Sequence, residues 1–239
     1  MAIHEIWVYL SGSPLLALIL TLTAYHAGTL AYERSSRHPL ANPVLIAVVL
    51  VAAAIVAMDM PYATYFEGAQ FVHFLLGTAT VALAVPIYKG LGALRGRMLP
   101  LLAALAAGGA VSIASAVGIA VLLGADRAIV GALWVKSVTA PIAMGVAERI
   151  GVSPTLTAVF AVSTGILGAM LARFVLDAVG SKAWWQRGFA LGVASHGIGT
   201  SRAFSVSEEA GTYAGLAMGL HGVLGALAIP LAAAWLRPV

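Results

Sequence analysis

A lysine followed by hydroxyl side chains and a proline forms a pattern suited to binding a small anion. Lys136 stands in an apolar stretch directly before Ser137, with Thr139 and Pro141 just after it. A buried ammonium group is costly, so it must contact protein, water or an anion. Proline favours the first turn of a helix, where free N–H groups attract negative charge. The pattern predicts a carboxylate bound by Lys136, Ser137 and Thr139. The alternative is a lysine at a helix end that reaches the membrane interface.

A second run combines hydroxyls, a histidine and an arginine with two glycines. It reads Ser195-His196-Gly197-Ile198-Gly199-Thr200-Ser201-Arg202. A guanidinium can hold a planar carboxylate through two parallel hydrogen bonds, whereas an ammonium acts as a point charge. We therefore expect Arg202 to bind the anion. Hydrogen bonds would come from Ser195, His196, Thr200 and Ser201. The alternatives are an ordinary interfacial arginine and a neutral histidine bonded between helices.

A third run supplies hydroxyls without a cation. Gly77-Thr78-Ala79-Thr80 precedes Pro86, and the pattern predicts Thr78 and Thr80 as further ligands. A histidine can gain and lose a proton near neutral pH, so His196 is a candidate for proton coupling. Glu67 is the acidic candidate for the same role, and it could equally be a loop residue beside an aromatic belt.

The motifs of enzymes are absent from the sequence. It has no cysteine, no His-Glu-x-x-His zinc pair, no Gly-x-Ser-x-Gly elbow and no phosphate-binding P-loop. We expect no enzyme, and therefore no catalytic residue, metal or cofactor. Without a nucleotide motif, active transport would depend on an ion gradient.

The composition indicates what must surround these residues. Of 239 residues, 61% are hydrophobic and 9% are charged, against about 25% charged in soluble proteins. The net charge is +4, but the basic residues are scattered and form no nucleic-acid patch. We expect an all-α, multi-pass protein in the lipid bilayer, with residues 1–239 as one integral membrane domain and no nucleic-acid partner.

Charge-free stretches predict seven or eight membrane segments, some of them interrupted or re-entrant. The stretches are Ser13–Tyr32, Val44–Met58, Phe71–Tyr88, Leu99–Gly124, Ile129–Val146, Ile150–Ala172, Gly188–Ser201 and Ala210–Leu236. Those that begin at Phe71, Ile129 and Gly188 contain the three runs above, and short interrupted segments are typical of transporter binding sites. Thr78–Ala84 also aligns with Ser137–Ala143, as an internal repeat would. The glycines at 211, 215, 219, 222 and 225 form one helical stripe, which favours core packing over dimerisation.

The basic loops predict the topology. Residues 33–38 and 89–97 hold the clearest basic clusters, and both fit the cytoplasmic side with the N-terminus outside. If every segment crossed the membrane, Lys182 and Arg187 would lie outside. We therefore expect at least one interrupted segment to be re-entrant or half-spanning.

The same runs resemble the LrgB/CidB family. The matching strings are Leu75–Tyr88, Lys136–Met144, Ala194–Ala203 and Tyr213–Leu220. Two positions differ from the family pattern: Thr78 where proline is frequent, and His221 where asparagine is frequent.

The resemblance implies two kinds of function. Bacterial members are described as holin/antiholin-like modulators of murein hydrolase export and cell lysis, acting with a small LrgA/CidA-type membrane partner. Members are also linked to pyruvate, and a plastid relative resembles a glycolate/glycerate translocator. Lone cations among hydroxyls favour a secondary transporter of glycolate, glycerate, pyruvate or lactate. We expect a small organic anion as ligand, the bacterial inner membrane as location, and a homo-oligomer such as a dimer.

Overall fold

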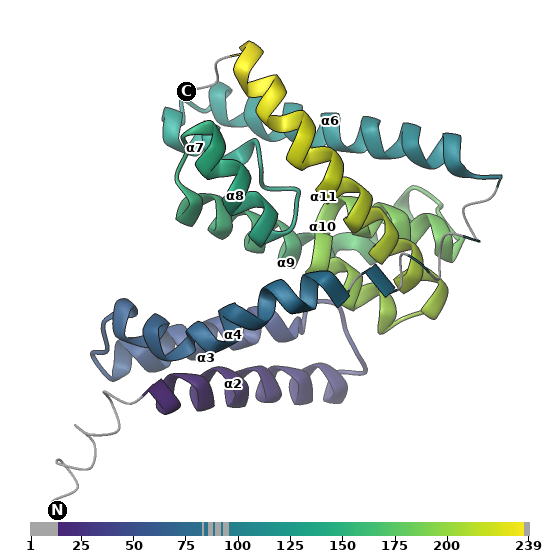
Figure 1. The fold of residues 1–239 in the computed structure, drawn as a ribbon. Helices are drawn as coiled ribbons and strands as arrows, with labels where there is room; N and C mark the ends of the chain where they lie inside the picture. Colours follow the sequence, from purple (N-terminus) through teal and green to yellow (C-terminus); the bar gives the residue numbers. More distant parts are fainter. Residues whose placement is uncertain (1–13, 83, 86–87, 89–91, 93–95, 237–239) are drawn as a thin grey trace, which may run out of the picture. The chain divides into compact units, whose positions relative to one another are not determined.

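The computed structural model describes residues 14–82, 84–85, 88, 92 and 96–236, and all regular structure in them is helical (Figure 1). The expectation of an all-α fold is therefore confirmed for this part of the chain. The chain divides into two compact units, Met1–Val81 and Ala82–Val239. The helices in the described residues include α2 (Pro14–Arg34), α3 (Pro43–Ala57), α4 (Tyr62–Ala82), α6 (Met98–Leu122), α7 (Arg127–Leu133), α8 (Ala140–Ile150), α9 (Pro154–Ala178), α10 (Trp184–Phe204) and α11 (Glu208–Leu236).

The first unit holds α2, α3 and α4. Asn42 caps α3, since its Oδ1 accepts the backbone N–H groups of residues 44 and 45 at 2.9 and 3.1 Å. Gly28 of α2 lies against the backbone of Pro43, where a larger residue would collide. The hydroxyl of Thr21 and that of Tyr65 are 2.8 Å apart and join α2 to α4. The Asn42 cap, the close packing of Gly28 on Pro43 and the contact between Thr21 and Tyr65 therefore stabilise the first unit.

α4 corrects one prediction from the sequence. It is helical from Tyr62 to Ala82, so the interruption expected at Gly77 to Thr80 is wrong. The hydroxyl of Thr78 donates to the carbonyl of Leu75 at 2.8 Å, a bond that a helix accommodates. Because residues 137–139 are not helical, the proposed repeat between the two segments is not confirmed. Pro86 lies outside the described residues.

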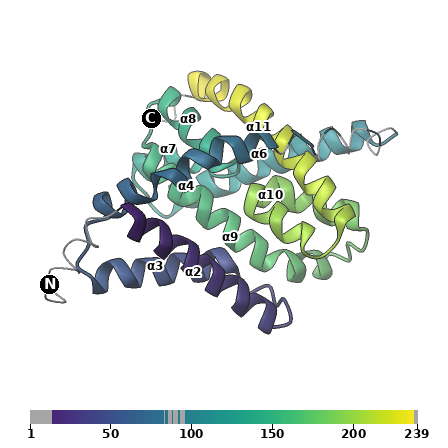
Figure 2. The same cartoon turned by 60° about the horizontal axis from the view of Figure 1, so that its bottom comes forward.

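The second unit is built around α9, α10 and α11, which lie side by side, with α6, α7 and α8 packed on them (Figures 1 and 2). Gly188 and Gly192 of α10 touch the backbone carbonyls of Ala210 and Ala214 of α11. Such an approach is possible only where one partner lacks a Cβ. Gly222 and Gly225 of the predicted stripe face Ile142 and Val138. These contacts are core packing, which is the use that the sequence favoured for this stripe.

In the part of the chain that the structure describes, four helices are long and apolar enough to cross a membrane. They are Leu15–Arg34, Met98–Leu122, Pro154–Ala178 and Glu208–Ala234. α3 is apolar but has 15 residues, about 22 Å against the roughly 30 Å of a bilayer core. Large apolar side chains such as Leu122, Val56 and Phe74 are mostly exposed. The chain is a membrane protein, whereas the count of seven or eight segments is not confirmed.

α10 reverses its direction in the middle. His196 has φ 41° and ψ −128°, which separates two half-helices. A Cβ on Gly199 would lie 2.7 Å from the carbonyl oxygen of Leu191, although residues eight positions apart in a straight helix are separated by about 12 Å. Arg187 and Arg202, from the two halves, line one cavity. α10 is therefore a hairpin with its tip at His196.

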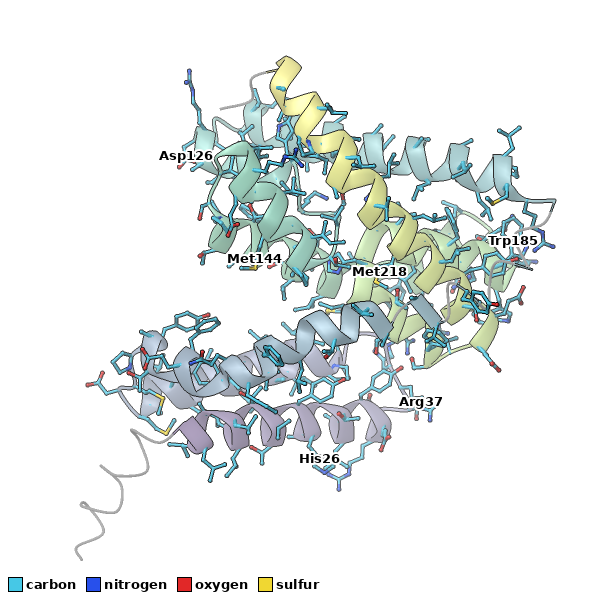
Figure 3. All side chains as sticks on the ribbon, viewed as in Figure 1. His26, Arg37, Asp126, Met144, Trp185 and Met218 are labelled. Atoms are coloured by element: carbon cyan, nitrogen blue, oxygen red, sulfur yellow. The ribbon has the colours of Figure 1, made fainter. Side chains whose placement is uncertain are left out.

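The chain between α6 and α9 bears on the conflict in the predicted topology. The Arg97 guanidinium donates to the Tyr213 hydroxyl at 3.2 Å and lies 4.8 Å from the ring centre of Trp185, which Figure 3 labels. The starts of α6, α10 and α11 therefore share one end of the unit. Because α9 ends shortly before Trp185, Lys182 and Arg187 lie at this end too. The chain between α6 and α9 must then turn back without crossing, as the charge pattern requires.

The cysteine-free chain makes this arrangement directly testable. Single cysteines placed by Ser181→Cys and Ser207→Cys should react with a membrane-impermeant maleimide from the same side. Ala125→Cys, between α6 and α7, should react from the opposite side. Labelling in detergent gives the control for reactivity. A Ser181→Cys and a Ser207→Cys that label from different sides would contradict the hairpin.

Candidate functional site

The first broken element separates α7 from α8. Asp126 caps α7 through a 2.8 Å bond from the backbone N–H of Ile129, and residues 134–139 then leave the helical conformation. α8 restarts with Pro141 in its first turn, as the sequence predicted, and Thr139 is its N-cap residue without a side-chain cap bond. Ser137 is fully buried. The break thus carries hydroxyl groups and a helix start into the interior.

Lys136 projects from this break into a cavity of about 780 Å³ between α6, α9 and α10. The Lys136 Nζ donates to the Ser112 hydroxyl of α6 at 3.1 Å. Thr164 and Gly168 of α9 and Ala194 of α10 also line this cavity. The lysine is half-buried, and it is the one cation among the described residues that line this cavity, where Ser112 and Thr164 supply hydroxyl groups.

The second broken element is the tip of the α10 hairpin. The His196 ring is 4% exposed, and its Nε2 lies 2.8 Å from the carbonyl oxygen of Ala161. The His196 carbonyl accepts the Thr200 hydroxyl at 2.8 Å. Thr200 also lies 3.8 Å from the sulfur of Met218 on α11 (Figure 3). A left-handed backbone at a non-glycine residue costs about 1–3 kcal/mol, and these contacts hold it in place.

The two breaks meet at α9. Ala161 packs with Val135 and Val138 of the first break, while its carbonyl contacts His196 of the second. His221 of α11 joins the same region, with its Nε2 3.2 Å from the Ser137 hydroxyl. These contacts place Ser137, His196 and Thr200 in one region of the second unit, with Lys136 and Thr139 on the first break and Ser195 beside the hairpin tip.

Several buried polar atoms of this region make no hydrogen bond in the described part of the chain. They are the Trp134 Nε1, Thr139 Oγ1, Thr157 Oγ1, Ser195 Oγ and His221 Nδ1 atoms. Each such group costs about 1–3 kcal/mol when it is left unpaired. All five lie on α9, α11 or the two breaks, so the unpaired hydrogen-bonding capacity is concentrated on the interrupted part of the second unit.

The other predicted ligands lie elsewhere. Arg202 lines a different cavity at the open end of the hairpin, and Ser201 is exposed. Thr78 is exposed on α4 of the first unit, and the side chain of Thr80 lies outside the described residues. Glu67 is also exposed on α4. Lys136 and Arg202 therefore do not share one cavity.

The residues that sequence reasoning missed are single polar side chains within apolar helices. Ser112 of α6 and Thr157 and Thr164 of α9 interrupt otherwise apolar runs, which is the only signal they give. Trp134 lies two residues before Lys136, and nothing in the sequence indicates that its Nε1 is buried without a hydrogen bond among the described residues. His221 is noted in the sequence only as a departure from the family pattern, and the structure places it against Ser137.

Comparison with known proteins identifies the family. The model of the LrgB-like family matches residues 21–235, a range that contains both breaks. The chain belongs to the LrgB-like family.

Relatives of this family match along nearly the whole chain. YwbG of Bacillus subtilis is 32% identical over 216 residues, 90% of this chain and 96% of YwbG. The holin-like protein CidB of Staphylococcus epidermidis is 25% identical over 90% of this chain and 94% of its own length. The antiholin-like protein LrgB of Bacillus mycoides is 26% identical over 92% and 95%. No solved structure matches the chain.

The hairpin tip depends on a glycine of α9. A Cβ on Gly165 would lie 2.7 Å from the His196 Cε1 and 2.9 Å from the Ile198 Cδ1. Gly165→Ala should therefore destabilise the protein by about 1–3 kcal/mol, since the tip must shift. Thermal unfolding in detergent, followed by tryptophan fluorescence, measures the change.

Gly145→Ala in α8 is the matched control, because nothing lies within 4 Å of its Cβ position. Alanine in a helix interior is favoured over glycine by about 0.5–1 kcal/mol. This variant should be as stable as the parent or more stable. Equal unfolding temperatures for Gly165→Ala and Gly145→Ala would contradict the packing described for the tip.

Proposed function

We propose that this LrgB-like membrane protein is a secondary carrier of small monocarboxylates of the glycolate, glycerate, pyruvate or lactate class. The observation that supports the proposal most is a set of buried, unpaired polar atoms on α9, α11 and the two breaks, together with Lys136 on the first break. Each unpaired polar atom in a membrane interior costs free energy, so a cluster of them is expected where a ligand binds.

The chemistry of the region suits a carboxylate with a hydroxyl or keto group beside it. The ammonium of Lys136 supplies positive charge, and the first turn of α8 supplies free N–H groups. The hydroxyls of Thr139 and Ser195 can donate to the anion, and Ser137, Thr200 and Thr157 lie nearby. A bond to a charged partner is worth about 1.5–3 kcal/mol. The cavity of about 780 Å³ that Ser112, Lys136 and Thr164 line is more than large enough for such an anion, and Ser195 directly follows its lining residue Ala194.

The finer features of the carrier belong to the same proposal. Residues 1–239 would form one integral membrane domain of seven or eight segments, with the breaks near the bilayer midplane. His196 lies within the site and is our candidate for the coupled proton, ahead of Glu67. The protein would act as a homo-oligomer in the bacterial inner membrane.

A second candidate is a holin- or antiholin-like modulator of murein hydrolase export and cell lysis. Two relatives carry the names holin-like CidB and antiholin-like LrgB. These names favour this candidate over the carrier, since neither names a carboxylate. The function would require an LrgA/CidA-type membrane partner, and it predicts release of unrelated solutes with little saturation.

Transport by the purified chain in proteoliposomes separates the two candidates. The carrier should show saturable counterflow of a radiolabelled carboxylate and no release of trapped sucrose. Lys136→Gln removes the charge and Ser195→Ala removes a donor, so each should lower uptake at limiting substrate about tenfold or more. Counterflow is measured with glycolate and with pyruvate in parallel.

Ser115→Ala is the control, because Ser115 is exposed on α6 and bonds only the backbone one turn earlier. It should transport like the parent. Uptake that is unchanged in Lys136→Gln would remove this site from the proposal. Sucrose release without saturation would instead support the holin-like candidate.

A further inference from the structure

The open end of the α10 hairpin contains a cavity of about 460 Å³ that the proposed carrier site does not use. α9, both halves of α10 and the start of α11 form its walls. Among the residues that the structure describes, its charged lining is four cations and one carboxylate: Arg173, Lys182, Arg187, Arg202 and Asp177. Such an excess of positive charge around one hollow points to an anionic ligand.

The carboxylate orients two of these cations. The Arg187 Nη1 lies 2.7 Å from the Asp177 Oδ1 and also donates to the Ser181 carbonyl at 2.7 Å. The Arg173 Nε is 3.8 Å from the Asp177 Oδ2. A single carboxylate cannot neutralise the whole lining. The Arg187 guanidinium is therefore fixed in position, and the described lining of the cavity keeps a net positive charge.

The rest of the cavity is apolar. Ala169, Ala172, Leu176, Leu191, Ala203 and Val206 line it. Trp184 stands at its edge, 42% exposed, with the Arg187 guanidinium 5.7 Å from its ring centre. Tryptophan beside basic residues is typical of the membrane–water interface. A ligand with a negative head and an apolar tail matches both parts of this lining.

We infer that this cavity binds a phosphate group, that of an anionic phospholipid, between the two halves of the hairpin. Arg187 comes from the first half and Arg202 from the second, so one phosphate can contact both. The basic residues gather at the end that the charge pattern assigns to the cytoplasm, where the leaflet is rich in anionic lipids. The site is independent of the proposed carrier function.

Lipid retention by the purified protein tests the inference. Native mass spectrometry should show phosphatidylglycerol bound more tightly than phosphatidylcholine of the same acyl chains. Lys182→Gln and Arg202→Gln should each weaken phosphatidylglycerol binding about fivefold, the effect of one charge near a membrane surface. Arg127→Gln, an exposed arginine of α7 outside this cavity, should bind the lipid like the parent.

A second arm adds glycerol phosphate or inorganic phosphate to the lipid-free protein and follows its unfolding temperature. Stabilisation by these ions that Arg202→Gln abolishes would support a phosphate site and assign it to a free phosphate instead of a lipid. Equal retention of the two lipids, together with no effect of phosphate, would overturn the inference. So would full phosphatidylglycerol binding by both variants, with Lys182→Gln guarding against a folding defect because Lys182 lies outside the helices.

Discussion

A broken helix inside a membrane protein must find partners for its freed polar groups within the protein itself. Lipid offers no hydrogen bonds, so an interruption is tolerated only where neighbouring helices or a polar cavity replace them. In the second unit, the break before α8 and the tip of α10 both meet this condition. The carbonyl of Ala161 contacts His196, and His221 contacts Ser137. α9 and α11 must therefore pack against the two breaks, because they supply these contacts.

Glycines make these contacts possible. Gly165 leaves room for the His196 ring, Gly168 for the Ser195 side chain, and Gly109 for the His221 ring. Where α10 and α11 pack backbone to backbone, Gly188 and Gly192 do the same for carbonyls. Close approach of helices is the main source of packing energy in lipid, since no hydrophobic force drives helices together there. Small residues therefore leave room for the side chains at the two breaks, and they also allow the helices to pack closely.

The sequence predicted those features that depend on local chemistry. Pro141 marks the start of α8, the Ser195–Arg202 run marks the tip of α10, and the long apolar stretches match the four candidate spans. It was wrong about Gly77–Thr80, because one glycine among good helix-forming neighbours does not break a helix and the Thr78 hydroxyl bonds within it. The charge pattern predicted that at least one interrupted segment turns back, but it did not identify α10 as such a segment. Hydropathy shows that a segment is short, whereas direction depends on one backbone conformation at His196.

The separation of the two cations illustrates the same limit. Lys136 and Arg202 have similar sequence surroundings, a cation among hydroxyls near a helix break. They differ in depth because the hairpin folds back: Ser195 lies at its tip, and Arg202, seven residues later and about 10 Å along the half-helix, returns to the open end. Contacts that hold Arg202 therefore also fix the half-helix that carries the tip. If an anion bridges Arg187 and Arg202, it restrains both halves at the end where they are most easily parted. The bound anion would then hold the tip residues in place relative to Lys136, although the anion itself stays at the open end of the hairpin.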